Sequence, residues 1–467
     1  MKGLSTRVWA LMPLAVALNL VMSNLVALLK PLPLYLDSVG TVLVGALCGP
    51  GAGAITGIAS IAVVALTAPT FFPFMLTAAV VGALSGWLAR RGIFATPGLA
   101  AAGGLFLGVA AALVSAPISA YLFGGVTGGG TDLLVAYFRG SGRSALESSL
   151  AQGLISDPLD KLVSLVLVQL LLAGLPESIR NGFPEGHRLA IVRRPRRARR
   201  GTGASGARPR ENWGARVAGE QRQQAAGWLQ ELTPLTKLLG LFVAVVMAIR
   251  FVPFEHGTIA SPLPLLAFGL FGLALSSGVG TEVGKVIGWF WAPLALSMTL
   301  INGLFGPTPR LVWRGLAYSP DGLAAGLGLA LRVLVILLAV ALILATTQPA
   351  ALAAGLEEVG LPPRFCYVVL AALSLAPGMA RRLDEVRCAQ AARGLYLGGP
   401  ALARLKSLVP LLGPAMLSVL AETEQRAMAL EARGFGASRR RTRMKAGSRG
   451  EWPLRLALLA VGVWALC

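Results

Sequence analysis

The sequence predicts an all-α protein that crosses a membrane many times, and its composition carries that prediction. Of the 467 residues, 55% are hydrophobic and only 13% are charged, whereas a soluble domain carries about 25% charged residues. Apolar runs close to the ~20 residues that a helix needs to cross a bilayer recur along the whole chain. These runs lack the alternation of membrane-spanning strands, so we expect a polytopic bundle of helices.

Six of these apolar runs fall in the first half of the chain. The second and third are short and flank the stretch CGPGAGAITG, so we expect them to be buried or kinked. Glycines repeat at intervals of four, at Gly49, Gly53 and Gly57 and again at Gly82 and Gly86, a spacing that lets membrane helices approach closely. The expected spans are 7–29, 36–48, 51–67, 71–90, 100–123 and 158–175.

A polar middle separates the two halves. Between Arg188 and Arg210 there are nine arginines and no acidic residue, and Pro, Gly and Ser interrupt any regular pattern, which predicts a solvated basic linker over 177–230. The second half holds five more spans and a charged insert at 346–450, in which an apolar segment is expected to pack against the membrane domain and to end at Pro377. The expected spans are 235–252, 262–278, 286–305, 322–345 and 452–467.

The formal net charge of +21 indicates a membrane orientation more than a nucleic-acid partner. Such a charge suggests nucleic acid in a soluble protein, whereas in a membrane protein Lys and Arg mark the cytoplasmic side and the anionic lipid surface. With a cytoplasmic Met1, the linker and the 346–450 insert also lie inside, and the loops 30–37 and 124–157 lie outside. We therefore expect a multi-pass membrane protein with no nucleic-acid partner.

The two outer loops hold the candidate substrate-binding residues. Carboxylates stand beside aromatic side chains next to a Gly-rich segment, a combination that suits a small polar ligand. Helix capping is the alternative for Asp37 and Asp132, since Asp37 comes directly before SVGTVLVGAL. The candidates are Tyr35, Asp37, Thr41, Tyr121, Phe123, Asp132, Tyr137 and Asp157.

The sequence contains no evident motif for catalysis or for a metal. GTEVGKV at 280–286 is too short for a phosphate-binding loop, and Val286 stands where such a loop has Ser or Thr. His187 and His256 are far apart, and the four cysteines have neither metal nor redox spacing. The sequence therefore shows no nucleotide site and no evident catalytic set, and we expect no metal or cofactor in this chain.

The tripeptide Ala-Arg-Gly occurs twice in the charged insert, in AQAARGLYLGG at 389–399 and in MALEARGFGAS at 428–438. Each copy reads as a helix end, because Arg in the last turn complements the helix dipole and Gly just after it accepts the left-handed conformation. The recurrence favours two slim helix ends that offer guanidinium groups to a partner. The residues are Ala392, Arg393, Gly394, Ala432, Arg433 and Gly434.

Three further motifs occur in a fixed order with these two. They are ELTPLTKLLGLF at 231–242, GLAAGLGLALRVLVILL at 322–338 and TTQPAALAAGLEEVGLPPR at 346–364. Over residues 231–467 the chain thereby resembles the transmembrane T component of energy-coupling factor (ECF) transporters.

The resemblance implies a role for the two arginines. In that family they end coupling helices and dock into grooves on two ABC-type ATPases, and those partners, not the T component, bind ATP and magnesium. Arg393 and Arg433 occupy these positions here. One departure is Leu235, where the family usually has Arg before Thr-Lys-Leu.

The first half resembles the substrate-binding S component of the same transporters, because six helices with both ends inside suit that family. The first helix of an S component often carries an Ala-xxx-Ala contact for the T component, and the nearest equivalents here are Asn19, Ser23 and Ala27. The resemblance divides the chain into an S-like domain at 1–176, a linker at 177–230 and a T-like domain at 231–467.

The combined expectation is a natural S–T fusion in a prokaryotic plasma membrane, part of an ATP-driven importer of a vitamin or other micronutrient. By analogy with the family, the S domain topples in the membrane to release its cargo inside. The acidic and aromatic loop residues favour a cationic or heterocyclic cargo such as a thiamine precursor, and the shortage of histidine disfavours nickel or cobalt. The alternatives are a membrane-embedded enzyme and a membrane sensor whose basic linker binds nucleic acid.

Overall fold

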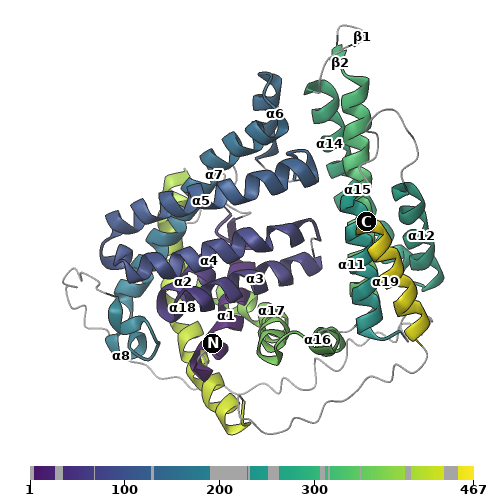
Figure 1. The fold of residues 1–467 in the computed structure, drawn as a ribbon. Helices are drawn as coiled ribbons and strands as arrows, with labels where there is room; N and C mark the ends of the chain where they lie inside the picture. Colours follow the sequence, from purple (N-terminus) through teal and green to yellow (C-terminus); the bar gives the residue numbers. More distant parts are fainter. Residues whose placement is uncertain are drawn as a thin grey trace.

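A computed structural model gives the fold (Figure 1). The prediction of an all-α multi-pass membrane protein is confirmed. The described part also holds one antiparallel hairpin, β1 (Leu311–Trp313) with β2 (Leu316–Tyr318). The structure describes residues 5–26, 35–67, 69–127, 131–189, 229, 232–250, 262–305, 311–313, 316–347, 349–358, 360–394, 401–435 and 451–466.

The N-terminal half is a bundle in which all six expected spans are helical. It differs from expectation between residues 124 and 157, where most of the predicted outer loop is helix. Ser144 and Glu147 form a capping box that starts α7 well before residue 158. The elements are α1 (Thr6–Val26), α2 (Val39–Cys48), α3 (Pro50–Thr67), η2 (Pro69–Phe74), α4 (Met75–Arg90), η3 (Ile93–Ala95), α5 (Pro97–Phe123), α6 (Asp132–Gly140) and α7 (Ala145–Gly174).

Close glycine contacts hold this bundle together. A Cβ on Gly53 of α3 would collide with the carbonyl oxygen of Gly82 on α4, and a Cβ on Gly82 would collide with that of Gly53. Every residue of α2 is buried, as expected for the short second span. The bundle therefore depends on small residues at helix crossings, as is usual in lipid.

The first part of the predicted linker is folded onto this bundle. Residues 177–189 form α8 (Glu177–Arg180) and η4 (Gly186–Arg188). Glu185 forms a 2.6 Å ion pair with Arg90 at the end of α4. The arginine-rich tract that predicted a linker, from 190 onward, lies outside the described residues up to 228.

The C-terminal half contains the expected spans and two long helices within the charged insert. The expectation that a helix ends at Pro377 is wrong, because α17 continues through this proline to Ala391. The elements are α11 (Pro234–Arg250), α12 (Leu263–Ser276), α13 (Gly280–Val286), a π-helical turn η6 (Ile287–Trp291), α14 (Ala292–Phe305), α15 (Pro320–Thr346), α16 (Pro349–Glu358), α17 (Pro363–Ala391), α18 (Ala401–Ala432) and α19 (Trp452–Leu466).

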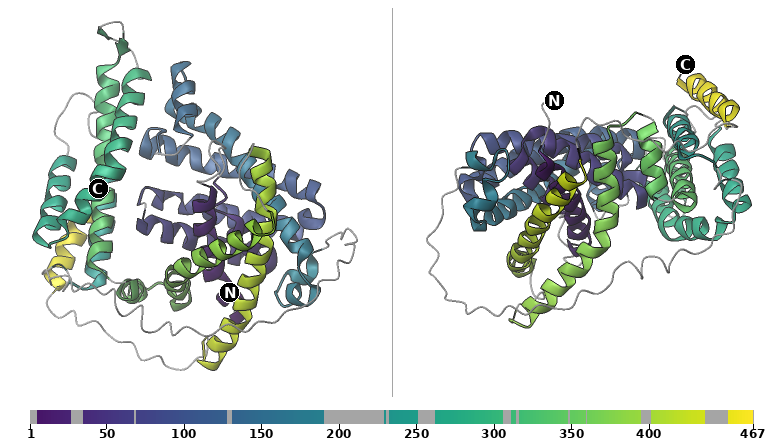
Figure 2. Two further views of the ribbon diagram at one scale, coloured as in Figure 1. Left: turned by 180° about the vertical axis from the view of Figure 1, so that it is seen from behind. Right: turned by 90° about the horizontal axis from the view of Figure 1, so that it is seen from below.

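Six helical segments among the described residues are long and apolar enough to cross a membrane. Five are the expected long spans, and the sixth is α17, which the sequence placed in a cytoplasmic insert. Figure 1 shows α17 end-on while α14 and α15 run lengthwise, and the view from below in Figure 2 shows α17 lengthwise. The axis of α17 therefore lies across the axes of α14 and α15.

The two halves share one apolar core. Residues of α17 and α18 join the buried cluster built around α1, and the guanidinium of Arg364 lies 5.9 Å from the ring centroid of Trp9. A second contact joins the end of α5 to α14 and α15, where Arg332 donates to the carbonyl oxygen of Tyr121 at 3.1 Å. The members from α17 and α18 are Val368, Val369, Ala372, Met379, Leu383, Ala415, Met416, Val419 and Leu420.

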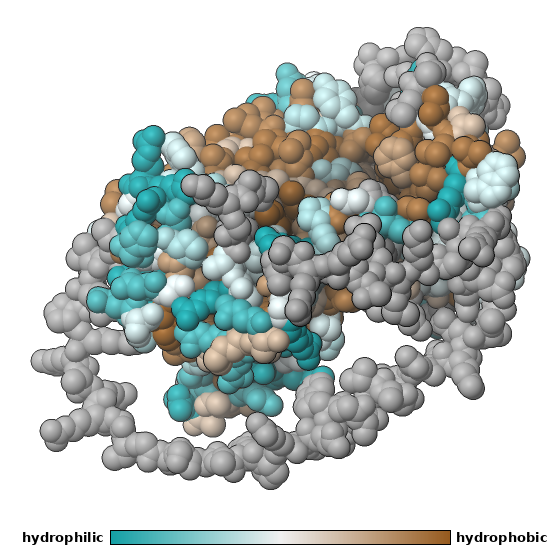
Figure 3. Space-filling view, turned by 60° about the horizontal axis from the view of Figure 1, so that its bottom comes forward, coloured by the Kyte–Doolittle hydropathy of each residue, from teal (hydrophilic) through white to brown (hydrophobic). Residues whose placement is uncertain are grey.

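The surface has the polarity of a membrane protein. Figure 3 shows a broad apolar area across one face and a separate, projecting polar area. Large apolar side chains are exposed on several helices of both halves, and such extended apolar surface suits contact with lipid. Examples are Phe106, Leu265, Phe268, Trp289 and Leu296.

Candidate functional site: a polar cavity and two exposed helix ends

A cavity of about 240 Å³ lies inside the N-terminal bundle. It is lined by the loop before α2, by α2, α3, η2, α4, α5 and α7, and by Thr127 and Thr131 between α5 and α6, so it is partly open and surrounded by six helical elements. Its polar lining includes Tyr35, Asp37, Thr41, Ser115, Gln152 and Asp157, and its aromatic lining includes Phe71 and Phe74. The cavity belongs wholly to the first half of the chain.

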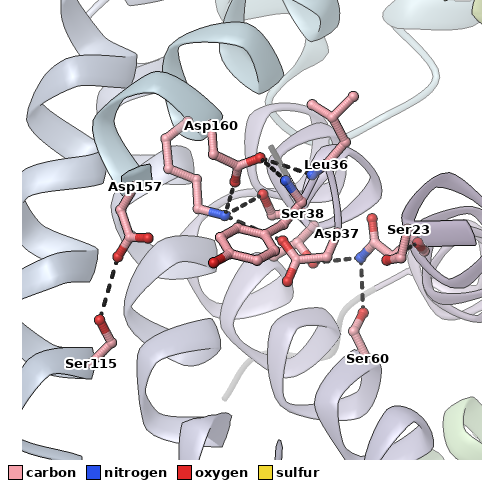
Figure 4. A network of polar contacts seen from close by, with 12 residues as sticks. Ser23, Leu36, Asp37, Ser38, Ser60, Ser115, Asp157 and Asp160 are labelled. Atoms are coloured by element: carbon pink, nitrogen blue, oxygen red, sulfur yellow. Dashed lines mark hydrogen bonds and ion pairs between the residues drawn. The ribbon is translucent and has the colours of Figure 1, made fainter. Parts of the chain in front are cut away.

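A buried carboxylate fastens the loop at the cavity mouth. Asp160 of α7 has no exposed side-chain surface, and its Oδ1 accepts the backbone N–H groups of Tyr35 at 2.9 Å and Leu36 at 2.8 Å (Figure 4). Leu36 has a φ of 45°, a left-handed conformation that a branched residue adopts only under constraint. The carboxylate thus holds the loop in a conformation that it would not favour alone.

The neighbouring ammonium group is fully bonded. Nζ of Lys161 donates to Asp160 Oδ2 at 2.7 Å, to Ser38 Oγ at 2.9 Å and to Asp37 Oδ1 at 3.3 Å. An ammonium has three donors, so these three partners use all of them. Lys161 is therefore neutralised by the protein itself.

A second network crosses the bundle at the wall of the cavity, which Thr41 and Ser60 line. The amide of Asn19 donates to Thr41 and to Ser60, both at 2.9 Å, and its oxygen accepts the N–H of Gly40 at 2.6 Å. Asn19 is only 2% exposed. Its side chain thus ties α1 to α2 and α3, so its polar atoms form bonds within the first half.

Tyr35 places a neutral phenol at the cavity. Its hydroxyl lies 2.9 Å from Oγ1 of Thr131. Burial raises the pKa of Tyr35 to about 12, and the nearby carboxylates of Asp157, Asp160 and Asp37 act in the same direction. The phenol therefore keeps its proton at physiological pH.

Asp157 differs from the other carboxylates because its partners are distant. The hydroxyls of Ser115 and Ser156 lie 3.4 Å from its oxygens, near the limit of a hydrogen bond, and Asp157 forms no ion pair with another described residue (Figure 4). Three further hydroxyls of the lining have no partner among the described residues: Thr70, Thr77 and Ser149. The cavity thus contains unused acceptors and donors.

The structure brings four of the predicted binding residues together, Tyr35, Asp37, Thr41 and Asp157. The capping alternative is wrong for Asp37, because Ser38 occupies the N-cap of α2.

The other four predicted residues do not line the cavity. Tyr121 and Tyr137 are 68% and 71% exposed, because they fall on the outer faces of α5 and α6. Phe123 is buried and stacks on Phe74 at 6.0 Å between centroids. Asp132 is the first residue of α6, where Thr131 is the N-cap, and its carboxylate accepts the N–H of Thr127 at 3.1 Å.

Sequence reasoning missed Lys161, Gln152 and the hydroxyls that line the cavity. A signal for Lys161 was present, since ionisable residues inside an apolar helix are costly and usually paired. The dipeptide Asp160-Lys161 stands at the start of such a run in α7.

Both Ala-Arg-Gly motifs end long helices, as predicted. Gly394 after α17 has a φ of 86°, and Gly434 after α18 has a φ of 68°. Arg393 and Arg433 are exposed, and neither forms an ion pair with another described residue. Glu422 of α18 joins the two helices, because it forms an ion pair with Arg382 of α17. It also forms a 2.7 Å ion pair with Arg426 of its own helix.

Comparison with known proteins concerns the C-terminal half. The profile of a family described as cobalt transport protein (CbiQ) matches residues 225–444. Proteins named energy-coupling factor transporter transmembrane protein EcfT are similar: that of Acidaminococcus fermentans is 27% identical over 46% of this chain and 82% of the relative. The counterpart from Thermosediminibacter oceani is 28% identical over 46% of this chain and 83% of the relative. The counterpart from Staphylococcus aureus is 26% identical over 49% of this chain and 86% of the relative.

Proposed function

Through its C-terminal half the chain belongs to the CbiQ/EcfT family of transport proteins, and on that premise we propose that it links a substrate-binding domain to the ATPases of an importer. The chain is a multi-pass membrane component of an ECF transporter. The observation that carries the proposal is the fusion of such a component to a bundle that contains a polar cavity.

The C-terminal half is proposed to contact two ABC-type ATPases through its Ala-Arg-Gly helix ends. Arg393 and Arg433 are exposed and unpaired within the described residues, so their guanidinium forks are available to acceptors on a partner. The glycines after them adopt positive φ, which ends each helix abruptly and leaves a narrow tip. Hydrolysis of ATP is assigned to the partners, and this chain is proposed to act without catalysis.

The N-terminal half is proposed to bind the cargo. Its cavity is larger than a few water molecules and contains polar groups that converge from several helices, as ligand sites do. The cavity lies outside the region that matches the family, which suits an additional, substrate-specific domain.

The direction of the helices supports a domain that turns in the membrane. The long helices α5 and α7 of the first half run across the direction of α14 and α15 (Figure 1). In this proposal the first half lies tipped on its side relative to the second, as expected of a domain that topples to release cargo inside. The apolar contact of α1 with α17 and α18 provides the mechanical link.

The orientation of the coupling helices is proposed to be cytoplasmic, and an exposed cysteine makes this testable. Cys388 on α17 is exposed and lies five residues before Arg393, whereas Cys48 and Cys366 are buried. A membrane-impermeant maleimide should label Cys388 in inside-out vesicles and not in right-side-out vesicles. A Cys388→Ser variant controls for other thiols, and labelling from outside would contradict this orientation.

The function itself is tested by affinity purification of the tagged chain from its native membrane. Mass spectrometry should find one or two ABC-type ATPases in stoichiometric amount, and a small molecule that is lost on unfolding. A well-folded chain that repeatedly purifies without any ATPase would reject the proposal.

A further inference from the structure

We propose that the cavity of the N-terminal half binds a small, flat organic cation, and that Asp157 is its counter-ion. The inference deepens the proposed function, on which it rests for calling this molecule the cargo. It is carried by the charge balance of the cavity, by unpartnered groups in its wall and by its aromatic lining.

Three carboxylates share one ammonium group at the cavity, so Lys161 leaves two negative charges unbalanced. Among the described residues at the cavity, the charged groups are Asp37, Asp157, Asp160 and Lys161. Asp160 and Lys161 form a 2.7 Å ion pair, and Asp160 also accepts two backbone N–H groups, so both are committed to the fold. Asp37 is 40% exposed and contacts the same ammonium at 3.3 Å.

Asp157 is thus the carboxylate that is free to take a ligand. From the described residues it accepts only two hydroxyls, both at 3.4 Å, although an ionised carboxylate offers about four acceptor sites. Asp157 is half-buried, and a charge that is largely withdrawn from water is costly unless it is paired. A cationic ligand would supply the missing partner.

Unpartnered hydroxyls in the same wall indicate a ligand with polar edges. Ser149 is 1% exposed and Thr70 is 5% exposed, and neither hydroxyl has a partner among the described residues. Buried polar groups are nearly always hydrogen-bonded in proteins. These hydroxyls line the cavity, so a bound molecule can satisfy them.

The aromatic lining and the volume indicate a flat and small molecule. Phe71 and Phe74 of η2 line the cavity, and their ring centroids lie 6.4 Å apart. The ring of Phe74 also stacks on that of Phe123. Aromatic faces attract cations and stack on flat rings. A volume of about 240 Å³ equals roughly eight water molecules at ~30 Å³ each, which suits one or two rings.

The test uses three probes of nearly one shape: benzamidine, which is protonated at neutral pH, neutral benzamide and anionic benzoate. Each is titrated calorimetrically into the full chain in lipid nanodiscs, together with cobalt chloride as a metal control. We expect benzamidine to bind at least about 10-fold more tightly than benzamide, since a hydrogen bond to a charged group is worth this much. Benzoate should bind most weakly.

Two variants test whether Asp157 causes the preference for the cation. Asp157→Asn should lower benzamidine affinity about 10-fold and remove the preference over benzamide. Glu147→Gln removes the same charge from the same helix, at an exposed capping-box position, and should leave all affinities unchanged. Since the probe series is read first on the unaltered chain, the inference remains testable even if Asp157→Asn fails to fold.

Several results would overturn the inference. These are an equal or stronger affinity for benzamide or benzoate, an undiminished preference in Asp157→Asn, binding of none of the organic probes, and tighter binding of cobalt than of benzamidine. If ATPases co-purify but the cation preference is absent, only this inference falls. If the preference is found but no ATPase is captured, the cavity remains a cation site and the transport proposal falls.

Discussion

The two functional regions of this chain place their charged groups in opposite ways. At the cavity, Asp160 is completely buried and paired with Lys161 at 2.7 Å. At the helix ends, Arg393 and Arg433 are exposed and have no ion-pair partner among the described residues. The first arrangement holds the loop beside the proposed binding cavity in place, and the second suits contact with another protein.

The difference predicts different sensitivities. A buried pair cannot lose one member without leaving an uncompensated charge, so changes to Asp160 or Lys161 are expected to damage the fold as well as binding. An exposed arginine leaves no such charge behind, so changes at the helix ends are expected to affect only the partner contact. The following experiments separate the two regions, from the largest expected effect to the smallest.

The largest effect is expected from Arg393→Ala combined with Arg433→Ala. Uptake by cells should fall to background, because each arginine at the centre of a protein contact contributes about 2 kcal/mol or more, ~30-fold in affinity. Ligand binding by the purified chain should be unchanged. Arg387→Ala, an exposed arginine of the same helix α17, is the matched control. Normal uptake by a well-expressed double variant would remove the coupling role.

The next largest effect is expected from Asp160→Asn. The amide can still accept the N–H groups of Tyr35 and Leu36, but Lys161 loses its closest counter-charge. We expect a loss of about 3 kcal/mol in the free energy of unfolding, measured by denaturant titration in detergent. Adding Lys161→Met should restore much of it. A single variant as stable as the unaltered chain would show that the pair does not hold the loop.

A smaller effect is expected from Gly53→Ala. The new methyl group would meet the carbonyl oxygen of Gly82, so α3 and α4 must separate. Overpacking of this kind costs about 1–3 kcal/mol, which should lower the thermal midpoint of the chain. Gly51→Ala is the control, because nothing lies within 4 Å of a Cβ there. Equal midpoints for the two variants would contradict the close helix contact.

The smallest effect is expected from salt. Raising the ionic strength from 0.1 M to 0.5 M should weaken capture of the ATPases several-fold, because exposed charges are screened beyond a Debye length of about 10 Å at 0.1 M. Binding of benzamidine to the cavity should change less. The reverse order of sensitivity would contradict the contrast between the two regions.

Local features of this fold were predictable, and contacts between distant segments were not. The left-handed glycines after Arg393 and Arg433 follow from the tripeptide alone, and the structure has both. The early start of α7 was hidden by its polar residues, although the capping box at Ser144 and Glu147 is visible in the sequence. Hydropathy alone locates apolar helices, so polar helical turns next to them are easily read as loops.

For the same reason, only part of the candidate site could be predicted from the sequence. Tyr35, Asp37 and Thr41 lie close together in sequence and were found from one loop. The bonds from Asp160 to the backbone of Tyr35 and from Lys161 to Asp37 join α7 to a loop more than 120 residues away. No local pattern reports such a pairing. Tyr121 and Tyr137 were misassigned because helix periodicity near them, which turns both outward, was not resolved.

Fastening and recognition are divided between two acids one turn apart on α7. Asp160 secures the loop through the N–H groups of Tyr35 and Leu36. Asp157 instead accepts a distant hydroxyl of Ser115 on α5. Position 157 is therefore free to vary in evolution while the architecture stays intact. Under the proposed function, a sister chain with a neutral residue there would keep the same scaffold and accept a different ligand.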